Sequence, residues 1–381
     1  MKVSGGITIV LAASLAFFSV VLVRYSIPAL LPYMVGKNGI STVMGGLIIT
    51  VLWVGYTVFQ VIGGLIVDRY GYNVVLYVLI LIAALNATYP LIINQYYLLL
   101  VVQFIMGSLL AITYVSLISM VLLNYGRGGG LGGAGIYQSM FFLASSISII
   151  LSPLLFSINR FTPFLLFSAI VASSLVPLTR VNNKVGGGSI VIGPENLGVL
   201  GMGGFIRLSS GFSYLGFLGW STYYVVHVLG ISPTLSGFYA FLSSIMGSLG
   251  AVIGGLTGDK AGYAIPSILS SLSLSIIVIV IPELTAFYLV AFLMLLLGFF
   301  YGFYAAPPSI AISKYTRNVG ATSGFLNFMS QLGGSISPYV IGFLLQYYDF
   351  AKTLLMVGIT SISLIIIGSI LLLYGYNHLT R

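Results

Sequence analysis

Long apolar runs, separated by short polar or glycine-rich breaks, follow one another along the whole chain. A helix needs about 20 apolar residues to cross a bilayer. Inside lipid its backbone polar groups must pair within the segment, so each run is predicted to be a transmembrane helix. Boundaries placed at clusters of charge, Pro, Asn or Gly give twelve segments: 6–35, 42–67, 73–93, 96–123, 132–157, 162–179, 198–229, 234–257, 264–281, 285–312, 321–347 and 352–374.

The composition agrees with a chain that is solvated by lipid. Of 381 residues, 59% are hydrophobic and 5% are charged, whereas about a quarter of an ordinary soluble domain is charged. This excludes a soluble enzyme, a disordered protein and a collagen-like fibre. The net charge of +9 comes from basic residues scattered singly between apolar runs, so a nucleic-acid partner is not expected. Without cysteine and with two histidines, no cofactor or metal centre is expected either.

Lysine and arginine in the loops predict the orientation. If both termini face the cytoplasm, nine basic residues lie on that side and three on the other. The cytoplasmic set is Lys2, Arg69, Arg127, Arg180, Lys184, Lys260, Lys314, Arg317 and Arg381, and the outer set is Lys37, Arg160 and Lys352. We therefore expect a multi-pass protein of the cell (plasma) membrane, whose first apolar run is a span rather than a cleaved signal peptide.

An internal repeat divides the chain into two halves. Residues 62–72 and 253–263 are identical at seven of eleven positions, with an offset of 191. An even number of helices per half leaves both halves in the same orientation, which is a parallel repeat. The predicted organisation is an N-terminal six-helix bundle (1–180), a cytoplasmic linker (181–197) and a C-terminal six-helix bundle (198–381).

The loop after the second segment, Gly64-x-x-x-Asp68-Arg69-x-Gly71, resembles the signature motif of the major facilitator superfamily. A weaker copy with Gly255, Asp259 and Lys260 follows the eighth segment. The resemblance implies an all-α membrane protein whose twelve transmembrane helices form two pseudo-symmetric bundles. It also implies a monomeric secondary transporter that works by alternating access and is not an enzyme.

In that family the aspartate of the motif is held near the start of the eleventh helix. This contact latches the two bundles in one state. The resemblance would place Asp68 near Ala321 and Thr322, and Asp259 near the glycine-rich start of the fifth segment. Arg127 and Arg317, 190 positions apart, are assigned to the same conformational latch. The alternative is that the motif residues form only a turn and a topology signal.

Arg24 lies inside the first span, where an arginine costs several kcal/mol unless it faces a partner or a cavity. The alternative is that its long side chain snorkels to the interface. The order Arg24, Tyr56, Gln60 is similar to the anion:cation symporter branch of the superfamily, which takes organic acids. The resemblance implies that Arg24 binds a carboxylate and that Tyr56 lines the site.

This chain departs from that branch in its acidic residues. Val23 precedes Arg24, segment 96–123 has no acid, and all five acids lie at predicted helix ends or in loops. No membrane-embedded carboxylate is left to carry a proton, so uniport or anion exchange is expected rather than proton symport.

Further candidates line the same predicted cavity. They are Arg207, which alternatively snorkels to the cytoplasmic side, Tyr223 and Tyr224 in segment 198–229, and the amide pair Asn327 and Gln331. Pro307-Pro308 in the tenth segment is predicted to be a gating hinge or a static kink. Together these residues predict a transporter for a small organic anion, with a carboxylate as the expected substrate. The alternatives are export of amphipathic compounds, sugar transport, and a receptor that has lost transport.

Overall fold

A computed structural model describes residues 2–34, 42–124, 133–180, 202–231, 233–261, 264–305, 319–345 and 347–379. In this part of the chain the backbone is almost entirely helical and forms no strand. The described residues contain ten helices long and apolar enough to cross a membrane.

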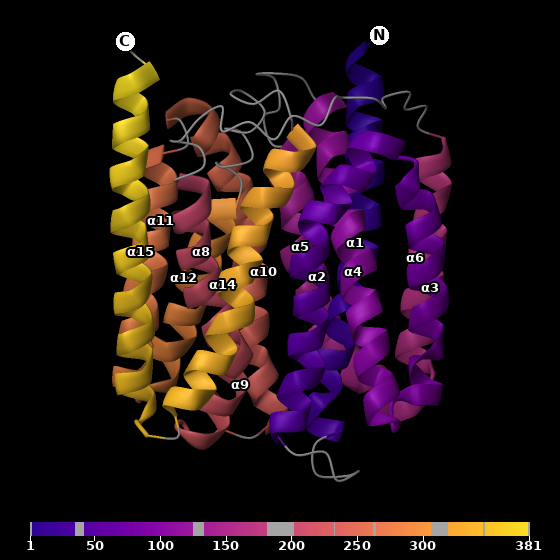
Figure 1. Cartoon of the computed structure of the whole chain (residues 1–381). Helices are drawn as coiled ribbons and strands as arrows, with labels where there is room; N and C mark the ends of the chain where they lie inside the picture. The colour runs from indigo at the N-terminus through magenta and orange to yellow at the C-terminus, as the bar shows by residue number, and fades with distance from the viewer. Residues whose placement is uncertain are drawn as a thin grey trace.

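The first half consists of six helices that run up and down across the molecule (Figure 1). They are α1 (Lys2–Met34), α2 (Thr42–Tyr70), α3 (Val74–Ile92), α4 (Tyr96–Asn124), α5 (Gly133–Ile158) and α6 (Thr162–Thr179). All six predicted segments of this half are found, because a continuous apolar run of this length has no stable alternative to a helix in lipid.

The second half has the same order of helices, but its first helix consists of four consecutive pieces. It contains η1 (Met202–Ile206), α8 (Arg207–Ser210), η2 (Gly211–Leu215), α9 (Gly216–His227), α10 (Pro233–Ala261), α11 (Ala264–Val280), η3 (Ile281–Glu283), α12 (Phe287–Ala305), α14 (Val319–Leu344) and α15 (Phe350–Leu379). The pieces η1, α8, η2 and α9 follow one another without a gap and correspond to the predicted seventh segment, but η1 and η2 are π-helical turns. The predicted linker and Pro307-Pro308 lie outside the described residues.

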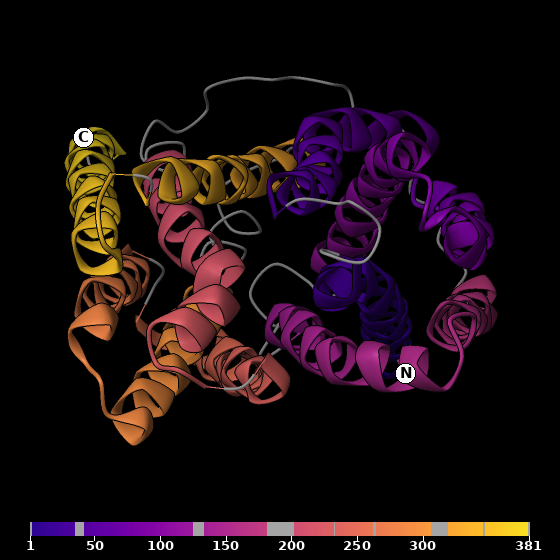
Figure 2. The same ribbon diagram turned by 90° about the horizontal axis from the view of Figure 1, so that it is seen from below.

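The buried apolar side chains form two main cores. One core draws its fully buried members from residues 10–178. The other draws them from residues 212–357, with Phe142 of α5 as its member from the first half. Figure 2, looking along the helices, shows α14 next to α2 and α10 next to α5, so these two pairs carry the contact between the bundles.

The internal repeat is visible in how the helices pack. In each half glycines let two helix backbones approach closely: an added Cβ atom would collide with the opposite backbone at Gly107, Gly254 and Gly298, and would lie only 3.1 Å from it at Gly63. The equivalent contacts, each 191 positions apart, are Gly107 on Leu52 and Gly298 on Ser243, and Gly63 on Ile112 and Gly254 on Phe303. Because both partners of each contact keep the offset, the two halves share one packing arrangement.

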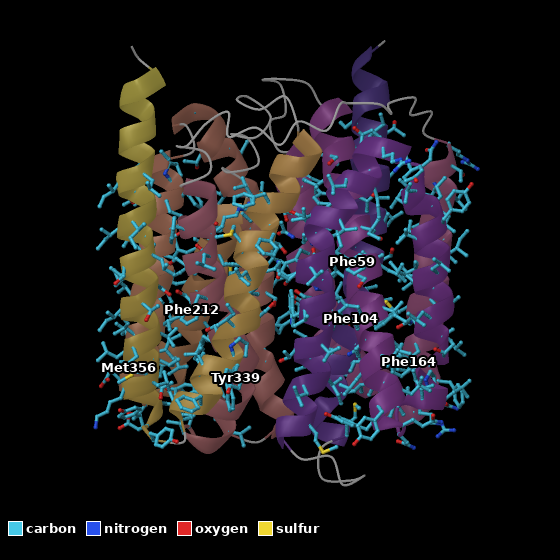
Figure 3. The ribbon with its side chains drawn as sticks, in the orientation of Figure 1. Phe59, Phe104, Phe164, Phe212, Tyr339 and Met356 are labelled. Atoms are coloured by element: carbon cyan, nitrogen blue, oxygen red, sulfur yellow. The ribbon has the colours of Figure 1, made fainter. Side chains whose placement is uncertain are left out.

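The outer surface of the helices is apolar along most of their length. Figure 3 shows side chains projecting outward over the height of the molecule, among them Tyr339 of α14 and Met356 of α15. Exposed tyrosines lie near the helix ends opposite the termini, such as Tyr97, Tyr288 and Tyr347. This distribution matches a lipid-facing surface with an aromatic belt at the membrane interface.

Both chain ends lie on one side of the molecule, since α1 begins and α15 ends at the top of Figure 1. The exposed basic residues Arg69, Arg180 and Lys260 belong to the ends of α2, α6 and α10 on this side. Arg160 and Lys352, also exposed, belong to the opposite side.

Candidate functional site

Arg24 of α1 is buried in a box of aromatic rings. Its guanidinium carbon lies 3.9 Å from the ring centre of Tyr56 and 4.1 Å from that of Trp53, both on α2. Phe141 of α5 adds a third ring at 5.8 Å. Trp53 and Tyr56 are three residues apart and therefore share one face of α2. Arg24 is only 3% exposed, so it does not snorkel to the interface as the alternative interpretation required.

The guanidinium group of Arg24 keeps unused hydrogen-bond donors. Its Nε and Nη2 atoms are buried and have no partner among the described residues. Ring faces attract the charge of a guanidinium group but do not accept its in-plane N–H bonds. The carboxylates whose side chains are described are both exposed: Glu283 is the last residue of η3, and Asp349 directly precedes α15. A buried cation without a paired anion is costly, which is typical of a site that receives an anionic ligand.

Side-chain amides supply further unpaired polar atoms near the contact between the bundles. Gln60 lies one turn beyond Tyr56 on α2, and both its amide nitrogen and its amide oxygen are buried without a partner. On α14, which packs against α2, the same holds for Nδ2 of Asn327 and Oε1 of Gln331. These groups offer donors and acceptors to a polar molecule at the bundle interface.

A row of aromatic rings leads from Arg24 into the second bundle. Phe141 packs edge to face on Phe142 at 5.1 Å, and Phe142 packs in the same way on Tyr301 of α12 at 5.9 Å. Tyr301 then stacks on Tyr214 of η2, with ring centres 3.8 Å apart and planes within 9°. The Tyr301 hydroxyl also shares a hydrogen bond with Ser330 of α14. The row therefore joins the two bundles near Arg24.

Arg207 is the second buried arginine, and it comes from the C-terminal bundle. It is 5% exposed and lies on α8 between the two π-helical turns. Its Nη2 donates a hydrogen bond of 3.3 Å to the carbonyl oxygen of Ala305, and the guanidinium carbon lies 5.6 Å from the ring centre of Tyr304. Its burial excludes the snorkelling alternative for this residue too.

Tyr224 does not join these residues. Its hydroxyl donates to the carbonyl oxygens of Ile281 and Leu284, at 3.1 and 3.4 Å, and its ring packs on Phe350. It therefore ties α9 to the loop between α11 and α12, at the end of the bundle opposite the chain termini. The side chain of Tyr223 lies outside the described residues.

The predicted latch is described only in part. Gly71 ends α2 with φ of 77°, a left-handed conformation that favours glycine. Gly64 and Gly255 are buried at helix positions, and Arg69 and Lys260 are exposed. The side chains of Asp68 and Asp259, together with all of Arg127 and Arg317, lie outside the described residues. The latch therefore remains a prediction.

Several residues of the site escaped prediction from the sequence. Trp53 had a usable signal, because Trp53, Tyr56 and Gln60 follow the spacing of one helix face. Phe141 and Tyr301 had none, since the chain contains 24 phenylalanines and 26 tyrosines with no distinguishing pattern.

These features define a class of protein. Helices of membrane-spanning length, arranged as two related bundles with unpaired polar groups where the bundles meet, are the architecture of a secondary transporter. The chain belongs to the Major Facilitator Superfamily, whose sequence profile matches residues 13–338 and, in a second match, 203–377. The predicted family and fold class are thereby confirmed, and this family consists of membrane transporters rather than enzymes, as the sequence predicted.

The chain is similar in sequence to two curated relatives and in fold to one solved structure. A probable galactarate/D-glucarate transporter of Bacillus subtilis (strain 168) is 29% identical over 169 residues, which are 42% of this chain and 37% of the relative. A D-galactonate transporter of Escherichia coli O6:H1 is 29% identical over 168 residues, 42% of this chain and 39% of the relative. The chain thus matches about two fifths of the length of these relatives.

The solved structure is that of the human organic anion transporter MFSD10 (TETRAN). It superposes with a TM-score of 0.79 over 96% of this chain and 99% of that one, at 15% sequence identity. At this identity the likeness establishes the shared fold.

Proposed function

We propose that the protein carries a small organic anion, specifically a carboxylate, across the membrane. The observation that carries this proposal is the burial of Arg24, two of whose guanidinium nitrogens have no partner in the part of the chain that the structure describes. A guanidinium group presents N–H bonds in a planar fork that matches the two oxygens of a carboxylate. An incoming carboxylate would supply both the missing charge and the missing acceptors.

The names of the two curated relatives support an anionic substrate. Galactarate, glucarate and galactonate are all sugar acids that carry at least one carboxylate at neutral pH. Such molecules also carry hydroxyl groups, for which the unpaired amides of Gln60, Asn327 and Gln331 are suitable partners.

The transport cycle follows from the two bundles. Rocking of one bundle against the other would expose a site between them to each side of the membrane in turn. The predicted latch residues would close the cytoplasmic side of the cell membrane, where both termini lie in this proposal. The whole cycle would take place within a single chain. Uniport or exchange suits the site better than proton symport, because the described carboxylates are exposed, Glu283 as the last residue of η3 and Asp349 directly before α15.

Thermal stabilisation of the purified protein tests the substrate class. The ligands are monocarboxylates, dicarboxylates, sugar acids, neutral sugars and lipophilic cations. A ligand that binds only the folded protein raises the melting temperature by mass action. We expect a carboxylate to stabilise the wild type and the control Arg160→Gln, whose arginine is exposed, but not Arg24→Gln.

One observation favours a second function, the export of amphipathic compounds. The aromatic row from Trp53 to Tyr214 presents large apolar faces at the bundle interface. Stabilisation by lipophilic compounds that is equal in the wild type and in Arg24→Gln would support export and contradict the carboxylate proposal.

A further inference from the structure

Arg207, like Arg24, is a buried cation with no negatively charged partner among the described residues. Its Nε atom is buried without a partner among the described residues. Its hydrogen bond to the Ala305 carbonyl oxygen is long, at 3.3 Å, and brings no negative charge. A second buried guanidinium group thus has no anion beside it among the described residues, and this one belongs to the opposite bundle.

The local backbone around Arg207 is unusual. The π-helical turns η1 and η2 lie directly before and after the four residues of α8. A π-turn widens the helix and shifts the direction of the side chains beside it, and such turns occur frequently at functional sites. Close packing accompanies the second turn, because a Cβ atom on Gly211 would collide with the backbone of Ser330. The backbone on both sides of Arg207 therefore determines the direction in which its side chain points.

Ring contacts connect the two arginines across the contact between the bundles. From Arg24, on the first bundle, they run through Phe141 and Phe142 to Tyr301 in the second. From Arg207, on the second bundle, they run through Tyr304, whose ring centre lies 6.4 Å from that of Tyr301. The contacts from two guanidinium groups of opposite bundles therefore meet at Tyr301.

We propose that Arg207 binds a second carboxylate, so that the preferred substrate is an aliphatic dicarboxylate bridging the two bundles. This inference rests on the proposed function and adds the substrate class to it. One carboxylate binds to Arg24, the other binds to Arg207, and the carbon chain passes Tyr301. A dianion neutralises both buried cations, whereas a monoanion leaves one of them unpaired. Two anchors on opposite bundles also draw the bundles together as the substrate binds.

A matched pair of sugar acids tests the inference. Galactarate and galactonate share a carbon skeleton and hydroxyl configuration, but galactarate has a carboxylate where galactonate has a hydroxymethyl group. Dissociation constants for both acids are measured by thermal stabilisation of the full chain, in the wild type, Arg207→Gln, Arg207→Lys, Arg24→Gln and the exposed control Arg160→Gln.

We expect the wild type to bind galactarate more tightly than galactonate. Arg207→Gln should weaken galactarate binding about 10- to 100-fold, the range for losing hydrogen bonds to a charged group. Its affinity for galactonate should stay close to that of the wild type. Arg207→Lys keeps the charge but loses the planar fork, so its loss should be smaller and again confined to galactarate. If Arg207→Gln does not fold, Arg207→Lys tests the inference instead, again by whether the loss of affinity is confined to galactarate.

The possible failures are distinguishable. Equal weakening of both acids by the Arg207 variants, or no effect on either, would overturn the dicarboxylate inference. The proposed function would survive that result if Arg24→Gln still abolished the binding of both acids. A wild type that binds no carboxylate would overturn both.

Discussion

Arg24 owes its environment to residues on two other helices. Two aromatic side chains of α2 cover its charged group at 3.9 and 4.1 Å, and Phe141 of α5 closes the box. These rings exclude water and attract the cation, while its N–H bonds stay available for a ligand. The sequence predicted Arg24, because a charge inside an apolar run stands out, and it predicted Tyr56 through the resemblance to the anion:cation symporter branch. It did not predict Phe141, because one apolar residue among many gives no such signal.

Replacement of Trp53 measures the contribution of the aromatic box. Trp53→Leu removes one ring face from Arg24, and a cation–π contact of this kind is worth roughly 0.5–2 kcal/mol. We expect the affinity for the carboxylate substrate to fall about 2- to 30-fold, because the guanidinium group is less firmly held. Ligand titrations by thermal stabilisation give the value, and Trp53→Phe, which keeps a ring, should fall in between. An unchanged affinity in Trp53→Leu would mean that the box does not position Arg24.

Among the secondary-structure elements, the helices were predictable and their irregularities were not. Uninterrupted apolar runs specify spanning helices, and the repeated segment at residues 62–72 and 253–263 revealed two related halves. The π-turns at η1 and η2 were not predicted. Such a turn adds a residue to a helical turn, and tertiary packing, here of Gly211 on α14, decides whether this is tolerated. The latch motif was recognisable, but its aspartate side chains are not described.

Helix packing in the two halves should respond equally to the loss of a glycine. A side chain at Gly298 would collide with the backbone of Ser243, as one at Gly107 would with that of Leu52. We expect Gly298→Val and Gly107→Val each to destabilise the protein by about 1–3 kcal/mol, the usual cost of overpacking. Thermal unfolding in detergent measures this, with Gly219→Ala as the control, since its added atom would meet Pro338 only at 3.8 Å. Valine variants as stable as the control would contradict the close packing.

The whole molecule consists of two bundles in contact along α2–α14 and α5–α10 (Figure 2). The contacts include a hydrogen bond of 3.1 Å between the hydroxyls of Thr57 and Ser335, and one of 3.2 Å from the hydroxyl of Ser248 to the carbonyl oxygen of Ser139. Such small polar contacts are suited to an interface that must separate and re-form. In alternating access, substrate binding and movement of the bundles are parts of one cycle.

A reversible cross-link tests whether the bundles must move. The natural chain has no cysteine, so Thr57→Cys combined with Ser335→Cys introduces the only pair of thiols. Their side chains are close enough for a disulfide across α2 and α14. We expect oxidation to abolish transport and reduction to restore it, with both single-cysteine variants unaffected. Transport at the wild-type rate by the fully cross-linked protein would contradict movement at this contact.

In the proposed function, the protein transports an organic anion that binds to Arg24. The most direct measurement is uptake of a labelled carboxylate, the one that most stabilises the wild type, into liposomes that contain the purified protein. We predict saturable uptake by the wild type and by the Arg160→Gln control. Arg24→Gln, inserted to the same level, should show only the background of protein-free liposomes. Carboxylate uptake by Arg24→Gln at the wild-type rate would contradict the claim.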